Sequence, residues 1–147
     1  MLTVADVMTW NPVTVQRATT LGEVIGLMKT HSCRQVPVVE DGQLIGIVTD
    51  RDIRLAMNSP LVLHERGDDL SLLNTSTAEV CMTPSPLTIE ASEPATQAAA
   101  LMRRYKFGGL PVLDRGRLVG IVTVSDILGS YITLLNAQEK ENLETEP

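Results

Sequence analysis

The sequence predicts a mixed α/β fold made of two copies of one β-α-β-β-α unit, packed through their sheets with pseudo-two-fold symmetry. The stretch GIVTDRDI at 46–53 returns as GIVTVSDI at 120–127. At the same shift of 74 positions, residues 8–53 align with 82–127 without a gap, and 16 of these 46 positions are identical. In each copy, β-rich stretches alternate with segments whose apolar residues recur at helical spacing. A three-stranded sheet with helices on one side leaves an apolar face exposed, which a second unit would bury.

The first half of repeat 1 is predicted to hold two helices and a strand. Residues 2–8 form a short amphipathic opening of one or two helical turns, ended by the Asn-Pro pair that follows. Residues 13–15 alternate and are β-rich, which predicts a short strand. Thr20 followed by Glu23 fits a capping box, and the apolar spacing after it predicts a helix of about 12 residues.

The second half of repeat 1 is predicted to be a hairpin followed by a helix. Residues 36–39 and 44–48 are apolar and β-rich, and Gly42 between them suits a turn with positive φ. The run 44–48 is continuous, as in a strand that is buried on both faces. From Thr49 to about Met57 the pattern becomes helical, so the strand is expected to lead directly into a helix.

The rest of the chain repeats this order after a linker. Residues 1–57 are assigned to repeat 1, 58–76 to a polar linker, 77–135 to repeat 2 and 136–147 to a flexible, frayed acidic tail. Repeat 2 is expected to begin with a short helix at 78–82, a strand at 87–89 and a helix at 94–102 that begins near Pro94. Two strands at 110–113 and 118–122 should follow, and then a final helix at 127–135 that is longer than its first-repeat counterpart.

Composition excludes several classes of function. The chain has 147 residues, a net charge of −6 and only 3% aromatic residues, which argues against a nucleic-acid partner. No apolar run approaches the roughly 18 residues of a spanning helix, and no signal peptide is visible, so no membrane partner is expected. Cys33 and Cys81 have no metal-ligand spacing, which favours free thiols in a reducing cytoplasm.

Several stretches resemble one known family. They are 6–9 (DVMT), 36–39 (VPVV) and 42–49 (GQLIGIVT) in the first repeat, and 80–84, 110–113 and 116–123 in the second. This pattern resembles the CBS domain, named after cystathionine β-synthase, in its usual tandem pair. The resemblance covers nearly the whole chain and implies a regulatory module. Such pairs bind AMP, ADP, ATP or sometimes S-adenosylmethionine in the clefts between repeats, regulate an attached or partner protein, and often dimerise.

The resemblance also implies two ligand sites, each at a Thr-x-x-Asp turn. Asp52 and Asp126 would hold the ribose diol of an adenosyl ligand, because a carboxylate can accept two hydrogen bonds at once. Side chains near each helix start would face phosphate, and each site would borrow residues from the opposite repeat. The ligand-binding candidates are Thr49, Arg51, Asp52 and Phe107 for one site, and Thr9, Val13, Cys33, Arg34, Ile121, Thr123, Ser125 and Asp126 for the other.

Residues 83–87 and Gly108 would also serve the Asp52 site. The charges differ between the two sites, because Arg51 accompanies Asp52 whereas the Asp126 site has Ser125 and would recruit Arg34 across the cleft. The Asp126 site is therefore expected to be the better nucleoside pocket.

Other interpretations stand beside this one. A single Thr-x-x-Asp before a helix is ordinarily an N-cap, and only its repetition favours binding. The main hypothesis is a stand-alone adenosyl-ligand sensor, not an enzyme, with no metal and no required cofactor, which forms a homodimer and signals to an unidentified protein in trans. The alternative is a dimeric structural scaffold with empty clefts. Trp10 is expected either at a dimer contact or as a lid over a cleft.

Overall fold

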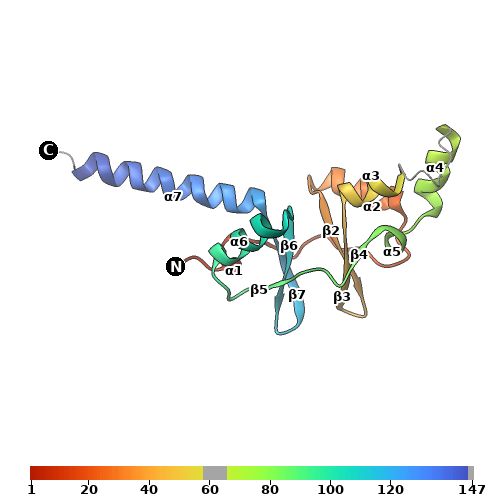
Figure 1. Cartoon of the computed structure of the whole chain (residues 1–147), viewed down its shortest axis with the longest axis horizontal. Coiled ribbons are helices and arrows are strands. Elements are labelled where there is room, and N and C mark those ends of the chain that lie inside the picture. Colours follow the sequence, from red (N-terminus) through yellow and green to blue (C-terminus); the bar gives the residue numbers. More distant parts are fainter. Residues whose placement is uncertain (58–65, 146–147) are drawn as a thin grey trace. The chain divides into compact units, whose positions relative to one another are not determined.

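The computed structural model describes residues 1–57 and 66–145 and has the mixed α/β architecture that the sequence predicts (Figure 1). Its residues form two compact units. Unit 1 comprises Met1–Asn11, Thr88–Asp114 and Val119–Pro147, and unit 2 comprises Pro12–Leu87 and Arg115–Leu118. Within the described ranges, no helix combines the length and the apolar character needed to cross a bilayer.

Unit 2 is built on the three-stranded antiparallel sheet β2-β3-β4. Its strands are β2 (Gln35–Glu40), β3 (Gln43–Thr49) and β4 (Thr83–Pro84), and its helices are α2 (Leu21–Thr30), α3 (Asp50–Met57), α4 (Arg66–Thr75) and α5 (Ala78–Cys81). The hairpin β2-β3 turns at Asp41 and Gly42, both with positive φ, so the turn has the two left-handed residues that match the twist of a hairpin. Thr20 caps α2 as predicted, because its hydroxyl accepts the Glu23 N–H at 3.2 Å.

Unit 1 is built on the four-stranded sheet β1-β7-β6-β5. Its strands are β1 (Thr9–Trp10), β5 (Ile89–Glu90), β6 (Gly109–Asp114) and β7 (Arg117–Thr123), and its helices are α1 (Val4–Val7), α6 (Ala95–Tyr105) and α7 (Val124–Thr145). Strand β5 runs parallel to β6, and β1 runs antiparallel to β7. Trp10 is exposed on the edge strand, and its indole N–H donates to the Ala5 carbonyl at 3.2 Å.

The opening segment of each repeat belongs to the unit that holds the core of the other repeat. Strand β1 comes from repeat 1 but pairs with β7 of repeat 2, and α1 belongs to the same unit. Strand β4 comes from repeat 2 but pairs with β3 of repeat 1, and α5 belongs to the same unit. The boundaries drawn at 57 and 77 follow the repeat in the sequence, whereas the compact units cut across it.

A methionine over a glycine joins each opening segment to its sheet. A Cβ on Gly120 would lie 2.5 Å from the Met8 sulfur, and a Cβ on Gly46 would lie 2.5 Å from the Met82 sulfur. The methionine side chains could move, but a Cβ on Gly120 would also lie 2.8 Å from the backbone oxygen of Thr9, and a Cβ on Gly46 would lie 3.1 Å from that of Thr83, so the constraint is stricter at Gly120. The close approach lets β1 and β4 lie against β7 and β3.

The core of each unit is apolar. In unit 2 the buried cluster contains residues from α2, β2, β3 and α3 together with Ala78 from α5. In unit 1 the buried cluster combines Val4 and Met8 with residues from α6, β6 and β7. No polar or charged side chain among the described residues is classed as buried. The opening segments therefore supply part of each core.

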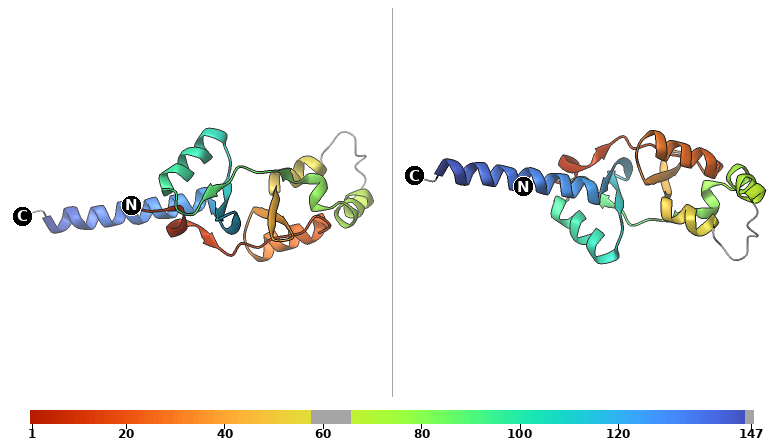
Figure 2. Two further views of the ribbon diagram at one scale, coloured as in Figure 1. Left: turned by 90° about the horizontal axis from the view of Figure 1, so that it is seen from below. Right: turned by 90° about the horizontal axis from the view of Figure 1, so that it is seen from above.

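Four predicted element boundaries were wrong. Residues 13–15 form no strand, since only Val15 makes an isolated parallel bridge, to Val38. The strand expected at 87–89 lies at Ile89–Glu90. The tail expected to fray from 136 is helical, because α7 continues to Thr145. The linker contains α4, which packs on α2 where Gly22 leaves room for the Leu73 carbonyl; the remaining linker residues 58–65 lie outside the described ranges (Figure 2).

Candidate functional site

The first Thr-x-x-Asp motif lies where β3 passes into α3 without a loop. The Thr49 N–H donates to Asp52 Oδ2 at 2.9 Å, and the Asp52 N–H donates to Thr49 Oγ1 at 3.0 Å. These reciprocal bonds satisfy N–H groups that the first turn of a helix would otherwise leave unpaired. The strand can therefore end and the helix begin at adjacent residues.

The second motif repeats this geometry where β7 passes into α7. The Thr123 N–H donates to Asp126 Oδ2 at 2.9 Å, and the Asp126 N–H donates to Thr123 Oγ1 at 3.2 Å. The Thr123 hydroxyl also lies 3.0 Å from Asp126 Oδ2. Both aspartates are half-buried. The two motifs thus present the same carboxylate in the same setting, once in each unit.

The capping interpretation accounts for one oxygen of each carboxylate. Thr3 and Asp6 make the same arrangement at the start of α1, with Asp6 Oδ2 accepting from the Thr3 N–H at 2.8 Å. Bonds from the backbone and the hydroxyl of Thr3 hold the pKa of Asp6 below its ordinary value. At Asp52 and Asp126, Oδ1 accepts no hydrogen bond from any residue in the described part of the chain. Each carboxylate thus keeps one oxygen without a hydrogen-bond partner among the described residues.

The structure places four other candidates in unit 2, together with Thr49 and Asp52. The Arg34 carbonyl accepts the Asp50 N–H at 3.0 Å, so the backbone of Arg34 supports the start of α3. The Arg34 and Arg51 side chains are exposed, whereas Cys33 and Val13 pack against the core. That Arg34, Cys33 and Val13 also serve the Asp126 site stays a prediction.

The remaining candidates lie in unit 1. Thr9 on β1 is opposite Ile121 on β7, so the opening strand of repeat 1 runs beside the strand that leads to Asp126. Ser125 is exposed in the first turn of α7. The Val124 N–H donates to the Gly108 carbonyl at 3.0 Å, which puts the neighbouring Phe107 near the start of α7. Phe107 stacks on Tyr105 with ring centroids 5.8 Å apart.

One polar residue that the sequence analysis missed lies beside the first motif. Gln35 begins β2 directly opposite Thr49. Its side-chain oxygen Oε1 is buried, and no described residue donates to it. The matching position of repeat 2 is Gly109, and this difference between the repeats was the only signal in the sequence. A ligand with an N–H or O–H group near the start of α3 would satisfy this acceptor.

The two cysteines are poor nucleophiles. Burial, together with the nearby charge of Asp52, raises the pKa of the Cys81 thiol to about 11. Burial also raises the pKa of Cys33. Both thiols are therefore protonated near neutral pH, and a protonated thiol neither attacks nor ligates a metal. Within residues 1–57 and 66–145, no three His, Cys, Asp or Glu side chains gather in a way that could hold a metal ion.

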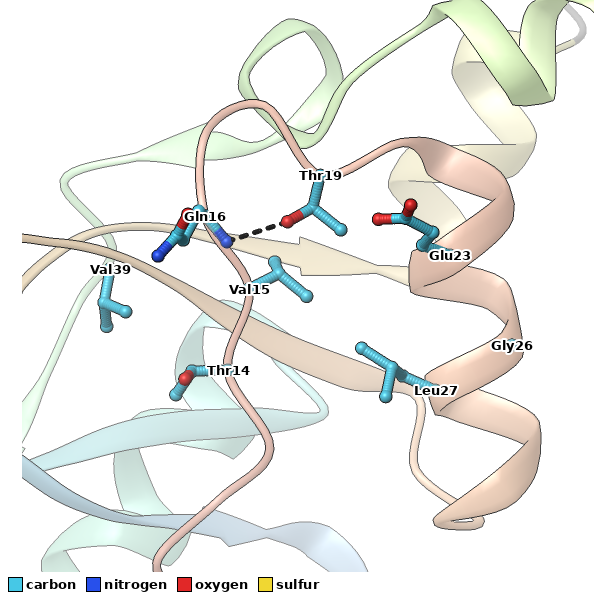
Figure 3. A pocket seen from close by; sticks show the side chains of 8 residues that line it. All are labelled: Thr14, Val15, Gln16, Thr19, Glu23, Gly26, Leu27 and Val39. Carbon is cyan, nitrogen blue, oxygen red and sulfur yellow. Dashed lines mark hydrogen bonds between the residues drawn. The ribbon is translucent and has the colours of Figure 1, made fainter.

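A hollow in unit 2 contains none of the candidate residues (Figure 3). It has a volume of about 620 Å³ and lies between α2 and the segment 14–19, where the Gln16 N–H donates to the Thr19 hydroxyl at 3.0 Å. Its lining includes the apolar Val15 and Leu27, and Glu23 is its charged side chain. The lining that the structure describes has a carboxylate and no cation, which does not suit a phosphate.

Comparison with known proteins decides the family. The model of the CBS domain matches residues 4–59 and 78–132, one match for each repeat. The chain belongs to the CBS domain family. A CBS domain-containing protein of Dictyostelium discoideum is 44% identical over 124 residues, which are 83% of this chain and 86% of that protein.

Two solved CBS structures share the fold and were determined with adenosyl compounds. CBSX2 in complex with AMP is 29% identical with a TM-score of 0.74, over 91% of this chain and 98% of CBSX2. The CBS domain pair of protein MJ0100, in complex with 5′-methylthioadenosine and S-adenosyl-L-methionine, is 29% identical with a TM-score of 0.75, over 89% of this chain and 96% of that one. CBS pairs similar to this chain thus bind adenosyl ligands.

Proposed function

We propose that this CBS pair is a stand-alone regulatory module, not an enzyme, that binds an adenosyl ligand of the AMP, ADP or ATP class through Asp52 and Asp126. The observation that carries the proposal is the duplicated Thr–Asp turn, in which each carboxylate holds a helix start with Oδ2 and keeps Oδ1 available. Membership of a family in which similar pairs bind AMP and S-adenosylmethionine supports the same ligand class.

The chemistry of each turn suits a nucleotide. A ribose diol needs an acceptor for two hydroxyls, and a half-buried carboxylate oxygen provides one without the full competition of water. The N-termini of α3 and α7 carry partial positive charge and favour phosphate nearby. Arg51 is exposed one position before Asp52, where it can add a full positive charge, whereas Ser125 offers a hydroxyl before Asp126. Each turn therefore offers groups that can bind the ribose and the phosphate of a nucleotide.

Regulation would follow from a shift between conformations. A ligand changes a partner only if it binds two arrangements of the protein with different affinity. We propose that the chain forms a homodimer and that the ligand-induced shift is passed to another protein in trans. The free thiols of Cys33 and Cys81 fit the reducing cytoplasm in which we place it.

The test is calorimetric titration of the full chain with AMP, ADP, ATP and S-adenosylmethionine, repeated on Asp52→Ala and Asp126→Ala. We expect binding of at least one ligand and its loss, by about tenfold or more, in one variant, with Asp126 the stronger site. No heat with any of the four ligands from a folded protein would favour the scaffold. Turnover of an added nucleotide that Asp126→Ala abolishes would show an enzyme.

A further inference from the structure

Helix α7 carries an apolar stripe that its own unit leaves uncovered. Leu128, Tyr131, Ile132 and Leu135 are 55%, 58%, 58% and 40% exposed, and none of the 22 residues of α7 is buried. Ile127, on a neighbouring face, packs against the core of unit 1 instead. Four apolar side chains at i, i+3, i+4 and i+7 form one continuous face of the helix. Leaving an apolar face of this size exposed to water is energetically unfavourable.

The spacing of the stripe makes it complementary to itself. The pattern i, i+3, i+4, i+7 has the same spacing in both directions along the helix. When two such helices pack antiparallel about a two-fold axis between Tyr131 and Ile132, Leu128 of one faces Leu135 of the other, and Tyr131 faces Ile132. An interface of this kind is isologous, because each copy contributes the same surface. Side chains at this spacing pack against a second helix.

Charge supports the antiparallel direction. The last part of α7 carries the acidic residues Glu139, Glu141 and Glu144, and Lys140 is the one basic residue among them. In the antiparallel pair, Glu139 lies beside residue 124 of the other copy, and Glu141 and Glu144 extend beyond the start of its α7 by about 3–8 Å at 1.5 Å per residue. In both views of Figure 2 the C-terminal half of α7 (blue) has no other element of unit 1 beside it.

Exposed basic groups lie at the end of α6, close in the chain to Gly108, which contacts the start of α7. Arg103 and Arg104 in the last turn of α6 and Lys106 at its C-cap are exposed. None of the three pairs with a carboxylate in the described part of the chain. Lys106 is two residues from Gly108, whose carbonyl accepts the N–H of Val124 at the start of α7. This start also carries the positive end of the helix dipole, although Asp126 already caps it.

We propose that the stripe 128–135 is a docking surface for a second copy of this chain, packed antiparallel, with residues 139–144 of each copy against the basic residues 103–106 of the other. This inference rests on the homodimer proposed above and names its surface. A parallel pair would bring the two acidic segments together, so the charges argue against it.

The first experiment measures the dimer dissociation constant by sedimentation equilibrium for the full chain, Ile132→Glu and Thr133→Glu. Thr133 is exposed on the opposite side of α7, so it is a control that carries the same added charge. We expect a dimer whose dissociation constant rises at least about tenfold in Ile132→Glu and stays within about twofold in Thr133→Glu. A wild-type monomer would overturn the homodimer; a dimer indifferent to Ile132→Glu would overturn the surface alone.

The second experiment tests the register by oxidation of single-cysteine variants in a Cys33→Ala/Cys81→Ala background. Ile132→Cys lies next to the axis and should form a disulfide with its own copy. Leu128→Cys and Leu135→Cys should react poorly alone, because like positions would be about 10 Å apart, but should cross-link when mixed. Equal self-cross-linking at all three positions would show a parallel pair and overturn the proposal.

The third experiment tests the charges. Replacing Glu139, Glu141 and Glu144 by Gln should weaken the dimer at low salt and flatten its salt dependence, since charge attraction between exposed groups is screened. Exchanging the charges should restore the salt dependence. In this variant the three glutamates are replaced by Lys, and Arg103 and Arg104 are replaced by Glu. A dimer strengthened by the Gln replacements would contradict the antiparallel arrangement.

Discussion

The aspartates of the two motifs serve local structure and proposed binding with different oxygens of one carboxylate. Asp6 lies outside either proposed site, and its Oδ2 holds the start of α1 by accepting from the Thr3 N–H, as Asp52 and Asp126 do from Thr49 and Thr123. The three residues therefore form a matched series within one chain. They allow the energy of capping to be separated from the energy of ligand binding.

Replacing each of these aspartates by alanine tests the separation. We expect Asp52→Ala and Asp126→Ala each to lower the free energy of unfolding by about 0.5–2 kcal/mol, the usual cost of a lost helix cap, and the exposed Asp6→Ala to lower it as well. Only Asp52→Ala and Asp126→Ala should also reduce the rise in Tm that AMP or ATP produces. Thermal melts with and without nucleotide measure both effects. Equal loss of the nucleotide response in Asp6→Ala would contradict the assignment.

The buried oxygen of Gln35 gives a second prediction. An unpaired buried acceptor costs about 1–3 kcal/mol, and a methionine of similar length removes it without leaving a cavity. Gln35→Met should therefore be neutral or stabilising in denaturant unfolding without ligand. It should also weaken binding at the Asp52 site if Oε1 accepts from the ligand. Marked destabilisation without ligand would show that Oε1 already has a donor, such as ordered water.

Among the helices and strands, the joints between opening segments and sheets depend on two glycines. Gly120→Ala should cost about 1–3 kcal/mol, because the new methyl group would overlap the Met8 sulfur and also the backbone oxygen of Thr9, and Gly46→Ala should cost less, because its backbone neighbour, the Thr83 oxygen, is 3.1 Å away. Gly26→Ala is the control: it lies in α2 with nothing within 4 Å of the added Cβ, and it should stabilise by about 0.5–1 kcal/mol. Urea unfolding of the three variants gives the comparison. A neutral Gly120→Ala would mean that both Met8 and the backbone of β1 move aside freely.

Helix α5 contributes a thiol whose titration reports on Asp52. The pKa of Cys81 rises from the ordinary 9.0 to about 11, so the folded state favours the neutral thiol. This contribution to stability is complete below pH 9 and is lost as the pH rises from 9 to 11. In a Cys33→Ala background, alkylation of Cys81 followed by mass spectrometry should accelerate over that range.

The same thiol offers a control on the cause of the shift. Asp52→Asn removes the negative charge that adds to the effect of burial, so alkylation should accelerate at a lower pH than in the parent. An unchanged profile in Asp52→Asn would show that burial acts alone.

The sequence predicted most elements because their signals are local. The two hairpins follow from Gly42 and Gly116 between apolar runs, and the Thr-x-x-Asp turns follow from capping chemistry. The short strands β1 and β4 were missed because two residues have no period to detect. The far end of α7 was predicted to fray because its polar residues show no apolar stripe, yet α7 reaches Thr145.

On the scale of the whole molecule, the sequence could not show which core each opening segment joins. Met8 aligns with Met82 in the sequence whichever sheet each one contacts. An opening segment that joins its own repeat and one that is exchanged into the other repeat therefore leave the same pattern of residues. Only the pairing of Thr9 with Ile121 and of Thr83 with Ile47 distinguishes them. The same limit applies to the site, since Gln35 becomes notable only once it lies opposite Thr49.

The exchange of opening segments between the two repeats predicts which fragments fold. The fragment 12–87 contains every buried residue of the unit 2 core, including Ala78, together with Met82 and β4. The fragment 1–57 follows the repeat but lacks all three. Circular dichroism melts should show cooperative unfolding for 12–87 and none for 1–57. A cooperative, equally stable fragment 1–57 would show that the exchanged segment contributes little.

The same exchange sets an order for events on the ribosome. Residues 12–87 leave the exit tunnel in one stretch and can fold as they emerge, but Val4 and Met8 must wait for α6 and β7. At about 5–20 residues per second, Gly120 is made roughly 6–22 s after Met8. During that interval Val4 and Met8 are without the apolar partners that they contact in the folded unit, which makes the segment 1–11 a natural substrate for chaperones that bind emerging polypeptides.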